Sequence, residues 1–172
     1  MILTGHDIVR ARAVGDLTLE PFDSDCVRPN SYDLHLGDRL LTYDEAVLDA
    51  RKDNPYTIHR IGPDGFLVQP DRVVLGHTVE RVGSAVYVPI LKARSTTARL
   101  GLFVHMTSDL IDLGSVGQLT LQLHAVQPLR VYAGMRLAQV TFWGTQGERM
   151  LYAGKYQGSK GPVASKSFQD GP

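Results

Sequence analysis

Arg72–Val82 (Arg-Val-Val-Leu-Gly-His-Thr-Val-Glu-Arg-Val) is the stretch that decides the fold, and Ala85–Ile90 (Ala-Val-Tyr-Val-Pro-Ile) follows it almost at once. Both runs are rich in β-branched residues and are interrupted by glycine or proline. This composition is typical of short β-strands that are separated by turns. The centre of the chain is therefore expected to be β-structure.

Runs of the same kind continue in both directions from this centre. Many short strands at this spacing are typical of a β-sandwich or a jelly roll, so a mainly β fold is expected. The polar segment 44–65, which contains two prolines, is expected to form an excursion or a minor hairpin. The other expected strands are Tyr32–Leu36, Arg39–Tyr43, Phe66–Gln69, Leu102–Thr107, Gln118–His124, Arg130–Tyr132 and Arg136–Trp143.

Two short helices are predicted. Thr4 is a suitable N-cap, Asp7 gives an imperfect capping box, and Gly15 ends the apolar periodicity that follows. The segment Arg94–Gly101 (Arg-Ser-Thr-Thr-Ala-Arg-Leu-Gly) has hydroxyl residues at its start and glycine at its end, which predicts a helix near residues 95–100.

Length and composition restrict the class of protein. The 172 residues are enough for one domain, and no apolar run approaches the ~18 residues of a membrane span. Because 18 basic residues balance 18 acidic ones, no net positive charge favours nucleic acid or membrane as a partner. The N-terminal residues lack the pattern of a secretory signal, so a cytoplasmic location is expected.

The single cysteine, Cys26, has two consequences. It excludes an intrachain disulfide, which agrees with a reducing compartment. It also excludes the zinc site of the base and nucleoside deaminases, which requires a pair of cysteines. Any deamination by this chain would therefore have to proceed without zinc.

Three places in the chain could carry chemistry. Arg94, Ser95, Thr96 and Arg99 could form an anion site, although a capped surface turn with solvated arginines would look the same. Asp112 precedes Leu-Gly and could be an ordinary turn residue or a carboxylate that points into a cleft. In Gln118–His124 the polar residues alternate with leucines and share one face of the predicted strand.

Four ordered motifs and one further stretch carry a resemblance to a known family. The chain resembles the dCTP deaminases of the dCTP deaminase and dUTPase superfamily, and the likeness covers nearly its whole length. Together with Ala93, Arg94–Gly101 is similar to the family's Gly-Arg-Ser-Ser-x-Ala-Arg-Leu-Gly motif, with Ala93 in place of the leading glycine and Thr96 in place of the second serine. The other matching stretches are Pro29–Gly37, Val104–Thr107 continuing to Asp112, Lys155–Gly158 and Gly134–Gln139.

The resemblance implies a distorted jelly roll of the dUTPase type, covering residues 1–172 as one domain and assembled as a homotrimer with sites between subunits. It implies a pyrimidine nucleoside triphosphate with bound Mg²⁺ as ligand, zinc-independent deamination of dCTP to dUTP and ammonia, and a C-terminal lid formed by residues 144–172. The residues implied to contact phosphates are Arg94, Ser95 and Thr96.

Further site residues follow from the same resemblance. Arg99 is implied to orient the reacting groups, and Asp112 to bind the sugar 3′-hydroxyl or, as in dUTPases, to orient the water that attacks the α-phosphate. Lys155 is implied to reach the terminal phosphate, with Tyr152 beside it. Tyr32 and Asp33 are expected to serve strand packing and subunit contacts.

Gln122 occupies the position of the family's general-base glutamate. Because an amide cannot exchange protons at neutral pH, its presence should lower deamination by ~10²-fold or more. Three explanations stay open: a natural relative that no longer deaminates, an introduced Glu-to-Gln change, or substitution by His124. Residues two apart on a strand are roughly 6–7 Å apart, which argues against His124.

Two other departures bear on the substrate. Ser115 stands where the family has an aromatic residue near the deoxyribose, and Ser159 stands where the lid commonly has glutamine. Ser115 would allow a modified or hydroxylated sugar to fit, and Ser159 would remove one contact of the lid to the substrate and loosen lid closure. The remaining hypotheses are a dCTP deaminase, a dUTPase-like enzyme using Asp112, a hydrolase of an unusual pyrimidine nucleotide, and a nucleotide-binding module without turnover.

Overall fold

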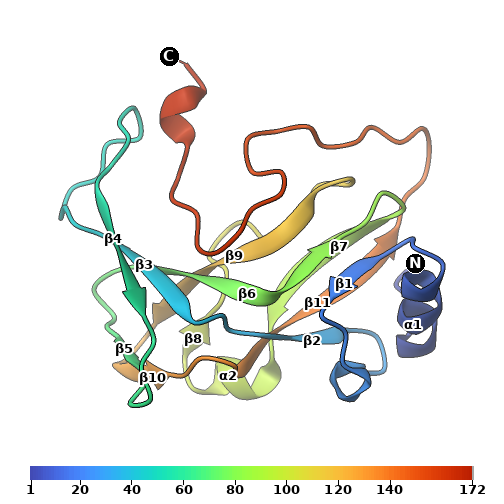
Figure 1. Cartoon of the computed structure of the whole chain (residues 1–172), viewed down its shortest axis with the longest axis horizontal. Helices are drawn as coiled ribbons and strands as arrows, with labels where there is room; N and C mark the ends of the chain where they lie inside the picture. The colour runs from blue at the N-terminus through green and yellow to red at the C-terminus, as the bar shows by residue number, and fades with distance from the viewer. Residues whose placement is uncertain (172) are drawn as a thin grey trace.

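The computed structural model describes residues 1–171 and is mainly β, as expected (Figure 1). Two α-helices and two short 3₁₀ segments accompany the antiparallel strands. The helices are α1 (Gly5–Ala13) and α2 (Ser95–Arg99). The strands are β1 (Thr18–Glu20), β2 (Tyr32–His35), β3 (Arg39–Tyr43), β4 (Tyr56–Arg60), β5 (Phe66–Val68), β6 (Val74–Gly83), β7 (Tyr87–Ala93), β8 (Leu102–Phe103), β9 (Val116–Ala125), β10 (Leu129–Val131) and β11 (Arg136–Gly144).

The strands form three sheets around one apolar core. The largest sheet has the order β4-β3-β6-β9-β8, with β1 paired to the far end of β6, and the second has the order β2-β11-β7. A small third sheet pairs β5 with β10. Fully buried side chains from both larger sheets meet between them, among them Leu34, Leu121, Leu123, Val140 and Phe142.

Most of the expected elements are present. Thr4 caps α1 by accepting a hydrogen bond from the backbone N–H of Asp7, and α2 lies where the Arg94–Gly101 pattern predicts it. The segment 44–65 contains β4, which pairs with β3 and so confirms the minor hairpin. The short strand β1 was missed, because its three residues give too little alternation to detect.

The expected strand Leu102–Thr107 is wrong beyond Phe103, where β8 ends. Val104 still accepts a hydrogen bond from the backbone N–H of Gln122 at 2.9 Å. The backbone N–H of Met106, two residues further on, donates to the side chain of Gln122 and not to a backbone carbonyl of β9. The ladder therefore stops here because a side chain replaces the backbone partner.

The C-terminal segment after β11 packs along β9 (Figure 1). The backbone of Gln118 donates to the carbonyl of Ser159 at 2.9 Å, and the backbone of Gly161 donates to the side chain of Gln118 at 2.7 Å. Further along, the backbone of Ser165 donates to the hydroxyl of Tyr43 at 2.8 Å. These bonds hold a tail that composition alone would leave mobile; its function as a lid stays a prediction.

None of the helices in residues 1–171 is both long enough and apolar enough to cross a bilayer. The longest, α1, has nine residues and lies against the core through Ile8 and Ala11.

A glycine pair tests the packing between β2 and β6. A Cβ atom at Gly37 would overlap the imidazole of buried His77, whereas one at Gly62 would meet nothing within 4 Å. We expect Gly37→Ala to lower the free energy of unfolding by about 1–3 kcal/mol, because overpacking shifts the surrounding core. Gly62→Ala, the matched control, should leave it nearly unchanged. Urea denaturation followed by circular dichroism measures both, and equal midpoints would contradict the prediction.

His77 should make stability depend on pH. Burial lowers its pKa below the ordinary value of 6.5, and its Nε2 has no hydrogen-bond partner within the described residues. Below about pH 6.5 the unfolded chain then binds more protons than the folded one, so stability should fall as the pH is lowered. In His77→Gln the free energy of unfolding should change less between about pH 7 and pH 5. An unaltered slope would show that His77 is not responsible.

Candidate active site

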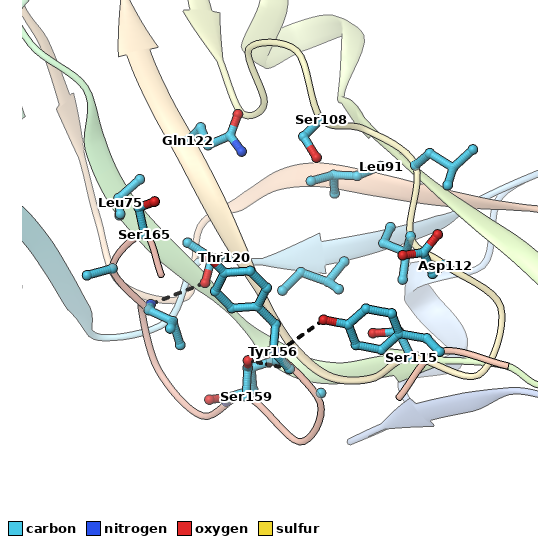
Figure 2. A pocket seen from close by; sticks show the side chains of 18 of the residues that line it. Leu75, Leu91, Ser108, Asp112, Ser115, Thr120, Gln122, Tyr156, Ser159 and Ser165 are labelled. Carbon is cyan, nitrogen blue, oxygen red and sulfur yellow. Dashed lines mark hydrogen bonds between the residues drawn. The ribbon is translucent and has the colours of Figure 1, made fainter. Parts of the chain in front are cut away.

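One cavity of about 460 Å³ lies between β9, the loop 108–115 and the C-terminal segment (Figure 2). Its apolar walls come from Leu75, Leu91, Ile111, Leu119 and Val163. Its polar lining residues are Tyr43, Ser108, Asp112, Ser115, Gln118, Thr120, Gln122, Tyr152, Tyr156, Ser159 and Ser165. The combination of apolar walls with a few polar groups is typical of a small-molecule site.

The alternation of β9 creates one wall of this cavity. Leu121 and Leu123 are fully buried in the core, while Thr120 and Gln122 project from the opposite face of the strand into the cavity. Pairing with β6 fixes this register, with Gly76 opposite Leu121 and Leu75 opposite Gln122. The sequence pattern of β9 therefore predicted the shared face correctly.

The amide of Gln122 has a defined orientation. Its Oε1 accepts a hydrogen bond from the backbone N–H of Met106 at 3.0 Å. Because a backbone N–H can bond only to the oxygen of the amide, this contact directs the nitrogen the other way. Figure 2 shows that nitrogen turned toward the interior of the cavity.

Asp112 lies across the cavity from Gln122 (Figure 2). It opens a turn in which the backbone of Ser115 donates to the carbonyl of Asp112 at 3.0 Å, and Gly114 adopts a φ of 87°. This left-handed conformation suits glycine. The Asp112 carboxylate is exposed at the edge of the cavity, and Ser115 lines the wall close to it.

Tyr152 also reaches the cavity, through the C-terminal segment. Its backbone N–H donates to the carbonyl of Leu113 at 2.7 Å, and its hydroxyl accepts from the backbone of Tyr156 at 3.1 Å. Among the residues singled out from the sequence, the structure therefore brings together Asp112, Ser115, Gln122, Tyr152 and Ser159.

The predicted phosphate contacts lie outside this cavity. Arg94, Ser95, Thr96 and Arg99 are absent from its lining, although they remain together on α2 and its N-cap. Ser95, Thr96 and Arg99 are exposed. Within one chain, the group of arginine and hydroxyl residues is thus separate from the cavity that contains Asp112 and Gln122.

Arg94 is held by a buried carboxylate. Asp33, with 1% of its surface exposed, pairs through Oδ1 with Nε of Arg94 at 3.1 Å and through Oδ2 with Arg28 at 2.6 Å. Arg94 also donates to the carbonyl of Arg136 at 3.1 Å. Tyr32 is fully buried and stacks on Phe22, in keeping with the packing function expected for it.

Lys155 does not enter the cavity either. Its ammonium donates to the carbonyl of Lys166 at 2.8 Å and to the carboxylate of Asp170 at 2.5 Å. The Lys155 ammonium thus forms an ion pair within the C-terminal segment. To contact a phosphate, Lys155 would have to break this pair with Asp170.

His124 is poorly placed to replace a base at position 122. It does not line the cavity, and its ring lies 6.1 Å from the ring of half-exposed Phe103. The spacing of residues along a strand and the observed packing therefore both argue against His124 as a replacement base.

Cys26 is not suited to act as a nucleophile. The thiol is buried, and desolvation raises its pKa to about 11, so it stays protonated at neutral pH. Across residues 1–171, no three His, Cys, Asp or Glu side chains come together as a possible metal cluster.

Sequence reasoning missed the residues that complete the cavity. Thr120 carries a detectable signal, since it lies two residues before Gln122 on the same strand. Tyr156 lies within the matching stretch Lys155–Gly158, although it was not singled out there. Tyr43 and Ser108 come from two distant segments, and nothing local marks them as neighbours.

Comparison with known proteins identifies the family. A model of dCTP deaminase-like proteins matches residues 2–145. This chain belongs to the dCTP deaminase-like family. The resemblance inferred from the motifs is thereby confirmed.

Curated relatives match over the full length of the chain. A "dCTP deaminase, dUMP-forming" from Clostridium beijerinckii is 40% identical over 171 residues, which are 99% of this chain and 98% of the relative. A protein of the same name from Leptospira biflexa gives the same values. A "dCTP deaminase" from Rhodopirellula baltica is 42% identical over 160 residues, 92% of this chain and 80% of the relative.

A solved structure supports the fold. The crystal structure of 2′-deoxycytidine 5′-triphosphate deaminase from Agrobacterium tumefaciens matches with a TM-score of 0.64 and 24% identity. The match covers 82% of this chain and 47% of the other, so this chain spans about half its length. The expected fold class is confirmed.

Asp33 is expected to position Arg94. Asp33→Asn removes a charge that compensates two arginines, so it should lower the free energy of unfolding by about 1–3 kcal/mol. Asp71→Asn is the control, because Asp71 forms only an exposed pair with Arg72. Thermal unfolding of the three proteins measures the difference, and an Asp33→Asn protein as stable as the control would refute the assignment.

Proposed function

We propose that this chain binds a pyrimidine nucleoside triphosphate in the described cavity and hydrolyses it at the α-phosphate, releasing pyrophosphate. The observation that carries this proposal is the position of a carboxylate, Asp112, and an amide, Gln122, on opposite sides of one cavity; within residues 1–171 the Asp112 carboxylate has no ion-pair partner. The first can accept a proton, whereas the second cannot.

The names of the relatives support a phosphate reaction in this family. An enzyme that makes dUMP from dCTP must remove two phosphates as well as the 4-amino group. At 40% identity over almost the whole chain, this protein is similar enough to inherit the phosphate step. Ring deamination is the step that Gln122 opposes, because it needs a group that takes a proton from water and delivers it to the leaving ammonia.

The proposed step uses Asp112 as general base. Its carboxylate would accept a proton from a water molecule while the oxygen of that water bonds to the α-phosphorus. The bond from phosphorus to the oxygen that bridges to the β-phosphate would break, and pyrophosphate would leave. Mg²⁺ would enter with the nucleotide, bound to phosphate oxygens, as part of the substrate; no zinc is needed.

We also propose a homotrimer in which neighbouring subunits share each site. The separation of Arg94 and Arg99 from the cavity supports this arrangement, since a triphosphate needs cationic groups and neither lysine nor arginine is among the residues that line the cavity of one chain. Lys155 would join them if the C-terminal segment closed over the nucleotide.

Asp112→Asn tests the proposed reaction. With Mg²⁺ and dUTP or dCTP as substrate, the unmodified chain should release pyrophosphate without ammonia. Because the asparagine amide cannot accept a proton, Asp112→Asn should lower kcat by about 10²–10⁴-fold. Coupled assays for pyrophosphate and ammonia measure both products.

Asp64→Asn is the matched control, since Asp64 is exposed and lies outside the cavity. Ammonia released from dCTP at a rate comparable with pyrophosphate would contradict the proposal, because Gln122 would then not prevent deamination.

A second candidate is a nucleotide-binding module without turnover. The loss of a proton-accepting group at Gln122, while Arg94 and Ser95 remain at the start of α2, favours it. Micromolar binding of dUTP with no product after prolonged incubation would identify this function.

A further inference from the structure

The amide of Gln122 is a donor with one orientation. Its oxygen is occupied by the backbone N–H of Met106, and its own backbone N–H is bonded to Val104. Turning the amide over would place its NH₂ group against the N–H of Met106, so the hydrogen bond would be lost and two donors would face each other. The side chain is therefore fixed as a donor toward the cavity.

Most neighbouring polar groups on this wall are already paired. Thr120 accepts from the backbone of Val163 at 3.2 Å. The amide of Gln118 is fully bonded: its oxygen accepts from the backbone N–H of Gly161, and its nitrogen donates to the carbonyl of Val79. The Nε2 of Gln122, by contrast, has no acceptor among the described residues, and Leu75 and Leu91 supply apolar walls of the same cavity. A ligand that fills this end must supply the acceptor.

The position of Asp112 sets the direction of the ligand. Gln122 and Asp112 stand on opposite sides of the cavity (Figure 2). If the triphosphate and sugar lie at the Asp112 side, as the proposed function requires, the base extends toward Gln122. The ring atom farthest from the sugar-bearing N1 of a pyrimidine is C4, so the substituent on C4 meets the amide nitrogen.

We infer that Gln122 selects a pyrimidine with a carbonyl at C4, uracil or thymine, over cytosine. A carbonyl oxygen accepts the hydrogen bond that Nε2 offers, while the amino group of cytosine would set one donor against another. This inference rests on the proposed function and adds the class of base to it.

Glutamate at the same position would have the opposite preference. One of its oxygens could keep the bond to Met106, and the other would face the cavity as an acceptor. An acceptor matches the 4-amino group and repels a carbonyl oxygen. The single change between glutamine and glutamate thus reverses the hydrogen-bonding polarity of this end of the cavity.

Binding of non-hydrolysable analogues separates recognition from turnover. Dissociation constants for α,β-imido-dUTP and α,β-imido-dCTP are measured by titration calorimetry with Mg²⁺. The unmodified chain should bind the dUTP analogue about tenfold or more tightly. Gln122→Glu should reverse the order, and Gln122→Met, which has a similar shape and no donor, should bind the two analogues within about threefold.

Gln127→Glu is the matched control, because it makes the same chemical change at an exposed position outside the cavity and should leave the preference unaltered. Thermal unfolding without nucleotide checks that each variant folds. If the unmodified chain binds the dCTP analogue as tightly as the dUTP analogue, or more tightly, the inference is overturned and nucleotide binding stands. If neither analogue binds, the proposed function fails and the inference fails with it.

Discussion

The antiparallel pairing of β6 with β9 is the interaction on which the rest of the structure depends. It runs from Val74 opposite Leu123 to Gly83 opposite Val116, with an irregularity between His77 and Arg81. Because successive side chains of a strand point to opposite faces, this register decides at once which residues of β9 enter the core and which line the cavity. A register shift by one residue would turn Leu121 toward the cavity and Gln122 toward the core, so neither the apolar core nor the polar wall of the cavity would form.

The outer face of β9 has a second function as the support for the C-terminal segment. Gln118 and Thr120 bind the backbone of that segment through their side chains, and Gln122 binds the loop that follows β8. Polar residues that a sequence pattern would assign to a wet surface thus hold two irregular segments in place. The cavity exists because these segments stand away from the strand between their points of attachment.

The distribution of charge explains why the cavity of a single chain suits a base and sugar better than a triphosphate. It contains one carboxylate, Asp112, whereas Arg94 and Arg99 lie on a different part of the molecule. Asp33 neutralises part of the positive charge around Arg94 and fixes the guanidinium in place. A second chain that brings these groups to the cavity would unite the two halves, which is the reason for proposing shared sites.

The sequence by itself determined what depends on neighbouring residues. The cap of α1 at Thr4, the alternation of β9 and the identity of the family all follow from short patterns, since capping and strand periodicity involve residues a few positions apart. The lack of a proton-accepting group at Gln122 is likewise a property of the residue itself. Only the tertiary structure decided that β8 ends at Phe103, that the tail lies on β9, and that the amide of Gln122 presents its nitrogen to the cavity. Each of these depends on a hydrogen bond between segments far apart in the chain, and no local pattern records which donor will meet which acceptor.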